Sequence, residues 1–201
     1  MTIIVGLTGG IASGKTTLSN FLKNKKFAVH DSDLVVKKIY SRPSPFFLKH
    51  LKKLGLSHSI KNNKINKNTI RDEVFNNKKT KKKLEEYIHS EVKKERNQFI
   101  NNHKKNKTKI LFLDIPLLFE AKLVSICDYV ILLYAPKKTK IQRAMSRKGM
   151  KKNILLKILE SQISDKIKKR KSDFIINTSK PKKHSFEMIL KAINNIMSLN
   201  A

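Results

Sequence analysis

The amino-acid sequence predicts an α/β fold: a three-layer sandwich with helices on both sides of a five-stranded parallel sheet. Three observations support this prediction. Short apolar runs alternate with longer segments that carry helical apolar spacing, as in strand–helix–strand units. The first apolar run, residues 3–7, leads into a glycine-rich loop, and a helical pattern follows that loop directly. The chain has 201 residues, of which 39% are hydrophobic, which is enough for one domain with a real core.

The glycine-rich loop at residues 9–16 reads Gly-Gly-Ile-Ala-Ser-Gly-Lys-Thr, the G-x-x-x-x-G-K-[ST] pattern of nucleoside-triphosphate enzymes. Its glycines let backbone N–H groups approach a polyphosphate, and the next helix directs its positive end at the same anion. Lys15 is expected to reach the β- and γ-phosphates, and the Thr16 hydroxyl to bind Mg²⁺. The other expected nucleotide-binding residues of the loop are Gly10, Ile11, Ala12, Ser13, Gly14 and Thr17. The alternative is a glycine turn with a chance lysine, which the flanking strand and helix argue against.

A pair of carboxylates follows the second predicted strand, residues 26–30. Because ligands bind beyond the carboxyl ends of the strands in an open parallel sheet, Asp31 and Asp33 are expected to face the phosphate loop. Either could accept a proton from an attacking hydroxyl or help to hold Mg²⁺. Helix capping is the alternative role. We favour a cap for Asp31 and chemistry for Asp33.

The third predicted strand, residues 110–114, also ends in an acid. A carboxylate at this place in phosphate-loop enzymes supports Mg²⁺ or its waters, so Asp114 is the second predicted metal-site residue. Pro116 stops the strand, and Glu120 is expected near the same edge of the sheet. Its alternative role is that of an acid at a helix start.

Residues 46–105 are polar and lysine-rich and carry helical spacing, with helices expected at 46–54, at 68–75 from a start at Asn68 or Thr69, and from about 84 onward. We expect an all-helical insertion at about 42–105 that binds the acceptor substrate. His89 falls within it, and spacing alone assigns that residue no role.

The last third of the chain is predicted to hold a lid and the end of the sheet. After the strand at 129–134, a basic helix carries Arg143 and Arg147 four positions apart, on one face. Two such arginines suit a lid, at about 137–170, that clamps phosphates, although a solvated basic face is the alternative. A helix at 154–169, a strand at 173–176 and a helix at 183–197 complete the expected elements.

Composition narrows the class of protein. The formal net charge is +30, but almost all of the positive charge is lysine spread along the chain, which indicates compositional drift on solvated faces rather than a nucleic-acid site. The single cysteine, Cys127, indicates a reducing compartment. No apolar run reaches the length of a membrane span, and the N-terminus does not read as a signal peptide. We expect a soluble, cytoplasmic protein. GTPases are disfavoured because the sequence has no N-K-x-D motif.

Over essentially its full length the chain resembles dephospho-coenzyme A kinase. The segments that carry this resemblance are Leu7 to Lys15, Asp31 to Asp33, Ile115 to Glu120 and Ser172 to Ile176, together with Arg143, Arg147 and Gln162. The resemblance implies phosphorylation of the ribose 3′-hydroxyl of dephospho-CoA with ATP and Mg²⁺, the last step of coenzyme A synthesis. No membrane or specific nucleic-acid partner is expected, and the oligomeric state is expected to be a monomer or a weak homo-oligomer.

The same resemblance implies roles for individual residues. Asp33 is the implied general base on the acceptor hydroxyl, and Lys15 and Arg143 are the implied stabilisers of phosphate charge, with Arg147 beside them. The implied acceptor-binding residues are Asp33, His89, Leu118 and Glu120.

The sequence departs from the family pattern at several positions. Ala12 stands where glycine is usual, a change that a negative φ would tolerate. Ser90 replaces a proline after His89, which could alter the helix start there, and Lys140 replaces a common glutamine. Asn177, Thr178 and Lys180 change a segment expected near the nucleotide base. Another phosphate-loop kinase, or a nucleic-acid-binding protein with a regulatory ATP site, remain as alternatives.

Overall fold

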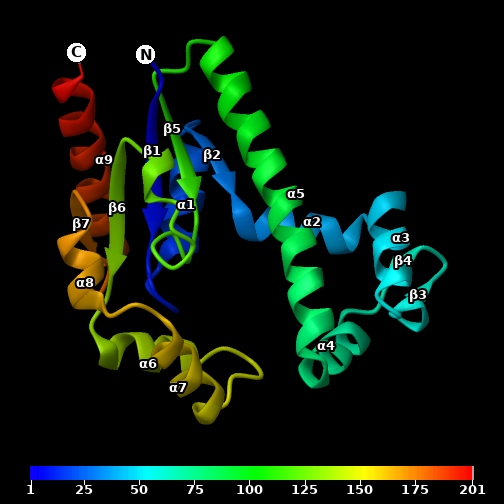
Figure 1. Cartoon of the computed structure of the whole chain (residues 1–201). Coiled ribbons are helices and arrows are strands. Elements are labelled where there is room, and N and C mark those ends of the chain that lie inside the picture. The colour runs from blue at the N-terminus through cyan, green and yellow to red at the C-terminus, as the bar shows by residue number, and fades with distance from the viewer. Residues whose placement is uncertain (201) are drawn as a thin grey trace. The chain divides into compact units, whose positions relative to one another are not determined.

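The computed structural model describes residues 1–200 (Figure 1). By its internal contacts the chain divides into two compact units, one formed by residues 1–31 with the chain from residue 103 onward, the other by residues 32–102. The strands of the first unit are β1 (Ile3–Thr8), β2 (Ala28–Asp31), β5 (Ile110–Asp114), β6 (Tyr129–Tyr134) and β7 (Phe174–Asn177). Its helices are α1 (Lys15–Asn24), α6 (Lys137–Met145), α7 (Lys152–Ser161), α8 (Asp165–Arg170) and α9 (Lys182–Leu199), with a short 3₁₀ turn at Val124–Ile126.

The five strands form one sheet in the order β2-β5-β1-β6-β7, and every neighbouring pair is parallel. The parallel five-stranded sheet flanked by helices is therefore confirmed. β1 lies at its centre, between β5 and β6. In the register of the sheet, Asp114 is opposite both Leu7 of β1 and Asp31 of β2. The carboxyl ends of these three strands thus meet at one edge, where the glycine loop begins.

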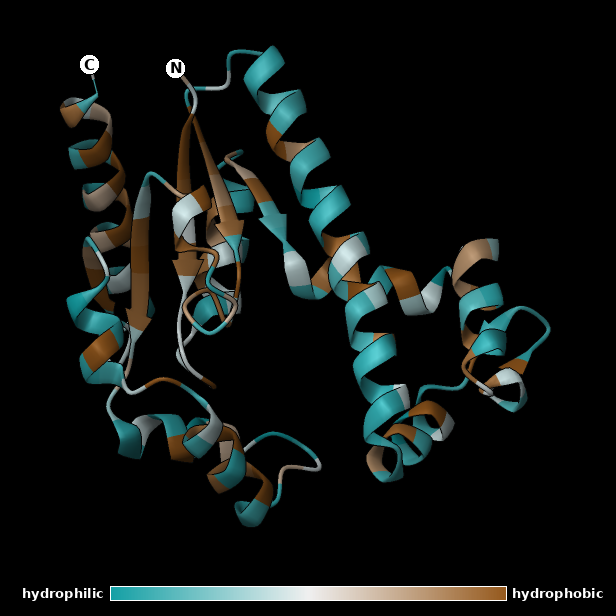
Figure 2. Cartoon of the chain, viewed as in Figure 1, coloured by the Kyte–Doolittle hydropathy of each residue, from teal (hydrophilic) through white to brown (hydrophobic). Residues whose placement is uncertain are grey.

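One face of the sheet is covered by α1 and α9. Alternate residues of β1, β5 and β6 point to this face because successive side chains in a strand alternate. Leu18 and Leu22 of α1 and Ile189, Ile193 and Ile196 of α9 pack against them, and all five are at most 4% exposed. Figure 2 shows the strands of this sheet as largely hydrophobic, as expected for parallel strands buried on both faces.

The opposite face of the sheet packs closely at Gly6. A Cβ atom at this position would lie 2.8 Å from Sγ of Cys127 and 3.1 Å from Cδ2 of Leu118. Leu118 is fully buried by this arrangement. The segment between β5 and β6 therefore packs on this face of the sheet. The helix α8, which precedes β7, contacts β6.

The helix predicted at 154–169 is wrong as one element, because the chain breaks it between α7 and α8. Ser164 begins α8, and its hydroxyl accepts the N–H of Ile167 at 3.4 Å. Such an N-cap serine favours a new helix start over continuation. Residues 162–164 join the two helices.

The second unit contains α2 (Ser32–Ser41), α3 (Pro45–Lys53), α4 (Lys67–Asn76), most of α5 (Lys78–Lys105), a 3₁₀ turn at Ser57–Ser59, and strands β3 (Ile60–Lys61) and β4 (Lys64–Ile65). It is not all-helical as expected, since β3 and β4 form an antiparallel hairpin. Its turn residues, Asn62 and Asn63, have φ values of 49° and 58°, and asparagine is among the residues that favour such two-residue turns.

The helices of this unit enclose their own core of Phe47, Leu51, Leu56, Ile70, Leu84 and Ile88. α4 begins after Asn66, whose side chain accepts the N–H groups of Asn68 and Thr69, so the predicted start at Asn68 or Thr69 is wrong by one to two residues. α5 runs without interruption through Ser90, whose hydroxyl donates to the carbonyl of Tyr87 at 2.8 Å. None of the helices within residues 1–200 is long and apolar enough to cross a membrane.

Candidate active site

The glycine loop between β1 and α1 has the geometry of a tight turn. The N–H of Ser13 donates to the carbonyl of Gly10 at 3.1 Å, and Ala12, the third residue of this turn, has a φ of +56°. A turn with positive φ at its third residue normally requires glycine. The condition under which alanine would be tolerated, a negative φ, is therefore not met, and Ala12 holds a backbone conformation that its Cβ disfavours.

The loop then feeds directly into α1. Gly14, at φ +84°, precedes the helix, and Lys15 and Thr16 form its first residues. The first N–H groups of a helix have no partner within the helix, so they and the helix dipole attract an anion at this place. A polyphosphate suits this site because a glycine-rich turn and a helix N-terminus meet here, with Gln162 packed against Gly10 and Thr178 against Gly14.

Lys15 and Asp114 form a close ion pair at the carboxyl edge of the sheet. Nζ of Lys15 lies 2.5 Å from Oδ1 of Asp114, whose side chain is only 1% exposed. Burial raises the pKa of Asp114, and the charge and hydrogen bond of Lys15 offset this only in part. The hydroxyl of Thr16 lies on an exposed residue one position further on. A hydroxyl and a carboxylate are hard oxygen donors that suit Mg²⁺ together with phosphate oxygens.

Arg143 of α6 is anchored to the loop that follows β7. Its Nη2 donates to the carbonyl of Thr178 at 2.6 Å, and its Nη1 to Oγ1 of the same residue at 3.3 Å. The Thr178 hydroxyl in turn donates to the carbonyl of Ser13 in the phosphate loop at 2.7 Å. Thr178 therefore links the lid arginine to the phosphate loop, a role that sequence reasoning missed because these residues are far apart in the chain.

A cavity of about 240 Å³ lies beside these contacts. Its wall includes Gly14, Thr17, Arg143, Arg147, Thr178 and Lys180. Of the predicted loop residues, Ala12, Gly14 and Thr17 line this cavity together with both predicted arginines. The lining is strongly basic, which suits the phosphates of a nucleotide.

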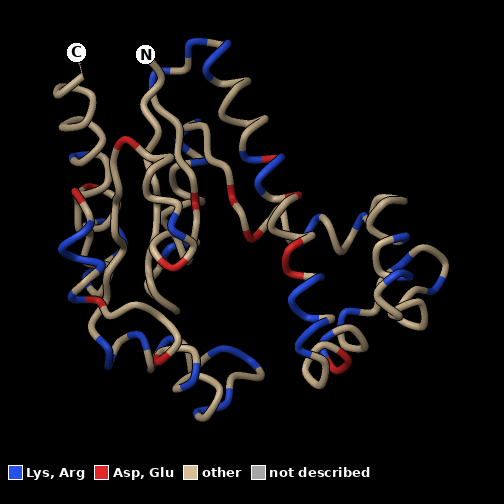
Figure 3. Tube along the Cα trace, viewed as in Figure 1, with Lys and Arg blue, Asp and Glu red and all other residues tan. Residues whose placement is uncertain are grey.

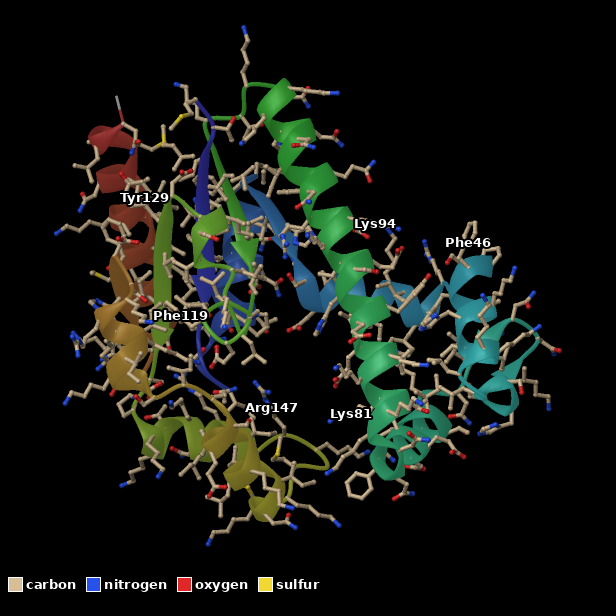
Figure 4. All side chains as sticks on the ribbon, in the orientation of Figure 1. Phe46, Lys81, Lys94, Phe119, Tyr129 and Arg147 are labelled. Atoms are coloured by element: carbon tan, nitrogen blue, oxygen red, sulfur yellow. The ribbon has the colours of Figure 1, made fainter. Side chains whose placement is uncertain are left out.

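Arg147 reaches this cavity from outside the helix. α6 ends at Met145, so the prediction that Arg143 and Arg147 share one helix face is wrong. Arg147 (labelled in Figure 4) belongs to the turn after the helix, where its N–H donates to the carbonyl of Ala144 at 3.1 Å. Ser146 caps the helix by donating its hydroxyl to the carbonyl of Arg143 at 3.0 Å. The N–H of Ser146 also donates to the carbonyl of Gln142, so Ser146 closes the last turn of the helix.

Glu120 is tied to the lid side of the first unit. Its Oε1 lies 2.8 Å from Nζ of Lys168, which is 1% exposed, and also accepts the N–H of Ile163 at 3.0 Å. Burial acts to raise the pKa of Glu120, but the hydrogen bonds and the charge of Lys168 outweigh it and lower this pKa below its ordinary value. Glu120 is therefore not a helix-start acid; it holds the segment that joins α7 to α8.

The three other residues predicted to bind the acceptor differ in their exposure to solvent. Leu118 is fully buried, so its side chain has no surface to offer an acceptor, and we do not retain it in the acceptor site. Asp33 is an exposed residue in the first turn of α2, and His89 is exposed on α5, both in the second unit. Asp31 is the last residue of β2, and its Oδ2 lies 2.9 Å from Nζ of Lys23, with which it forms an ion pair.

The basic residues are not gathered on one element. Figure 3 shows Lys and Arg on the helices of both units, with fewer acidic residues between them. Within residues 1–200 there is no group of three or more His, Cys, Asp or Glu side chains that could hold a metal ion without other ligands.

Known proteins of similar sequence match nearly the whole of this chain. The family model described as Dephospho-CoA kinase matches residues 3–183. The dephospho-CoA kinase of Bartonella quintana is 32% identical over 195 residues, covering 96% of this chain and 98% of that protein. A second relative, the dephospho-CoA kinase of Bacillus cereus, is 31% identical over 199 residues, covering 98% of this chain and all of that protein.

A solved structure extends the likeness to three dimensions. The dephospho-CoA kinase from Campylobacter jejuni superposes with a TM-score of 0.75 at 27% identity, and each chain is covered over its whole length. The match therefore includes the phosphate loop, the parallel sheet and residues 137–170. This chain belongs to the dephospho-CoA kinase family, whose members are kinases that carry out the final ATP-dependent step of coenzyme A biosynthesis.

Proposed function

We propose that this chain transfers the γ-phosphoryl group of ATP to the ribose 3′-hydroxyl of dephospho-CoA. The observation that carries the proposal is the family match over residues 3–183, joined to an intact phosphate loop whose lysine is held at the sheet edge by Asp114. The products are ADP and coenzyme A. We propose that the reaction takes place in the cytoplasm, with no nucleic acid or membrane as partner, in a monomer or a weak homo-oligomer.

The proposed chemistry begins with binding of the triphosphate. The triphosphate is proposed to lie against the phosphate loop and the first turn of α1, at Gly10, Ile11, Ala12, Ser13, Gly14 and Thr17. The N–H groups of Ile11, Ser13 and Thr17 already donate to Gln162, Gly10 and Gly14, so the phosphate oxygens are proposed to accept the other N–H groups of the loop and helix start. Lys15 stabilises negative charge on the transferred group, and Arg143 and Arg147 contribute from the lid. Thr16 and Asp114 would hold Mg²⁺, which neutralises phosphate charge when bound.

Asp33 is proposed to orient the acceptor hydroxyl and to accept its proton as the hydroxyl attacks the phosphorus in line. Support comes from its place in the chain, two residues beyond Asp31. Asp31 is the last residue of β2, so Asp33 follows directly on the carboxyl end of a strand of the parallel sheet, the end at which such sheets bind ligands. A carboxylate on an exposed residue can reach a substrate without displacing core side chains.

We also propose which segments of the chain bind the acceptor and which close over the phosphates. Residues at about 42–105 are proposed to bind the acceptor, with His89 as a contact, and residues at about 137–170 to act as the lid. Glu120 is proposed to contribute to the acceptor site only through the segment that it holds, because its Oε1 is already engaged by Lys168 and Ile163.

The test is ADP release from ATP and Mg²⁺ in moderate salt, with and without dephospho-CoA. The proposal expects release that depends on dephospho-CoA, with coenzyme A formed in equal amount. If folded protein binds ATP but shows no such dependence, the acceptor assignment is wrong. A panel of nucleoside and nucleotide acceptors then identifies another kinase, and ADP release stimulated by RNA or DNA identifies a nucleic-acid-dependent activity.

A further inference from the structure

The phosphate loop is hydrogen-bonded to the segment that joins α7 to α8. Oε1 of Gln162, in the segment between α7 and α8, accepts the N–H of Ile11 at 3.2 Å. The two residues are 151 positions apart in the chain. A Cβ atom at Gly10 would lie 3.0 Å from this same oxygen. The side chain of Gln162 therefore lies directly against the loop backbone and uses the space that glycine leaves.

Three contacts fix the segment that carries Gln162. The next residue, Ile163, donates its N–H to Glu120 at 3.0 Å. Asp165 pairs with Lys140 of α6 at 2.6 Å, and the Lys140 side chain is only 7% exposed. Lys168 pairs with Glu120 at 2.8 Å. A glutamine on an anchored segment loses little further freedom when it makes a hydrogen bond, so its contact with the loop is well defined.

The phosphate loop contains a non-glycine residue in a left-handed backbone conformation. Ala12, next to Ile11, has a φ of +56°, which an alanine adopts at a cost that glycine does not have. The hydrogen bond from Ile11 to Gln162 fixes the peptide between Gly10 and Ile11, at the start of the turn whose third residue is Ala12. It therefore favours the loop shape in which Ala12 is left-handed, against the preference of its own side chain.

We propose that Gln162 is a positioning residue for the phosphate loop: it holds the N–H of Ile11 so that the loop keeps its shape in spite of Ala12. The side chain need not touch the reacting atoms. The lid and the phosphate loop are coupled through it, because the anchors of Gln162 include Lys140 of α6. This inference rests on the proposed function only in taking ATP as the ligand of the loop.

The first test uses Gln162→Leu, which keeps the size of the side chain and removes the acceptor. Hydrogen exchange of the Ile11 amide in the protein without nucleotide is expected to rise about tenfold, the scale of one lost hydrogen bond. The dissociation constant of a fluorescent ATP analogue is expected to rise by a similar factor. The KM for ATP is expected to rise more than kcat falls, since the residue acts on the loop and not on the transferred group.

Matched variants separate this role from a general effect on folding. Gln142→Leu changes the same residue type at an exposed position of α6 and is expected to leave exchange and binding unchanged. Gln162→Asn, whose shorter side chain cannot reach Ile11, is expected to reproduce the effect if Gln162→Leu fails to fold. Gln162→Glu keeps an acceptor and is expected to preserve the protection of the Ile11 amide.

The decisive comparison adds Ala12→Gly. Glycine adopts the left-handed conformation freely, so the effect of Gln162→Leu on ATP binding is expected to be several-fold smaller in the Ala12→Gly background. The proposal is overturned if Gln162→Leu leaves Ile11 exchange and ATP binding at wild-type values, or if Ala12→Gly does not reduce its effect. Exchange and ATP binding need no acceptor, so a protein that passes these tests and makes no coenzyme A would contradict the proposed function alone.

Discussion

The ammonium nitrogen of Lys15 lies 2.5 Å from Oδ1 of Asp114, and the two side chains are 12% and 1% exposed. The lysine of the phosphate loop and the acid at the end of β5 thus neutralise each other at the edge of the sheet. Both charged groups have little contact with water, so each depends on the other for its counter-charge. Loss of one partner therefore leaves a poorly solvated charge behind, which is far more costly than loss of a surface ion pair.

Lys15→Ala is predicted to lower kcat/KM for ATP by roughly 10²–10³-fold, the effect typical of losing one preorganised donor to developing charge. It is also predicted to lower the free energy of unfolding, because Asp114 loses its counter-charge. Steady-state kinetics and urea unfolding measure the two effects. Lys37→Ala, at an exposed position of α2, is the control. Unchanged kinetics for ATP would remove Lys15 from the mechanism.

Asp33→Asn is predicted to lower kcat by about 10²–10⁴-fold, the usual contribution of a general base, because the amide cannot accept the proton. ATP binding is predicted to stay within about twofold of wild type, since the proposed role concerns only the acceptor hydroxyl. Single-turnover rates and equilibrium binding of ATP separate the two. Asp72→Asn removes an exposed carboxylate of α4 and serves as the control. Turnover near wild type in Asp33→Asn would show that the base has been assigned to the wrong residue.

Arg143→Lys is predicted to lower kcat/KM for ATP by about tenfold although it keeps the charge. The guanidinium donates from two nitrogens to Thr178, at 2.6 and 3.3 Å, and a lysine cannot reproduce that planar geometry. Kinetics with ATP as the varied substrate measure the loss. The matched variant, Arg170→Lys at an exposed position of α8, is predicted to be neutral. An equal loss in both variants would point to a general charge effect instead.

The ion pair of Glu120 with Lys168 is predicted to make stability depend on pH. The pKa of Glu120 is lower in the folded protein, so its contribution is present above the unfolded pKa, about 4.3, and is lost as the pH falls through the folded pKa. Glu120→Gln is therefore predicted to be less stable than wild type at pH 7, by up to about 3 kcal/mol, with a difference that shrinks below about pH 4.

Urea unfolding of both proteins at pH 7 and at about pH 3, below the unfolded pKa of a glutamate, measures this difference. Glu85→Gln, which removes an exposed carboxylate of α5, is the control and is expected to change stability little at either pH. A difference between Glu120→Gln and wild type that stays constant with pH would contradict the assigned role of the Glu120 charge.

Much of the fold was predictable from local sequence. The apolar runs before Gly9 and before Asp114 predict buried strands because parallel strands are apolar on both faces. The loop pattern with Lys15 predicts an anion site because its chemistry is encoded in consecutive residues. The order of these strands then places Lys15 and Asp114 at one edge, as the rule for open parallel sheets requires.

Predictions that depended on element ends were less accurate. The prediction that Arg143 and Arg147 share one helix face is wrong because α6 ends at Met145. Helix ends depend on caps and turns, which the apolar periodicity of the sequence does not report. The hairpin at Asn62 and Asn63 was missed for a similar reason, because strands of two residues are too short to show an alternating pattern.

The sequence by itself therefore determined the sheet, the phosphate loop and the chemical class of the reaction. Only the tertiary structure decided the left-handed backbone of Ala12, the bond from Arg143 to Thr178 and the contact of Gln162 with Ile11. The physical reason is distance along the chain. Apolar spacing and loop motifs report on neighbours within a few residues, whereas these contacts join residues that only the packed sheet and its lid bring within hydrogen-bonding range.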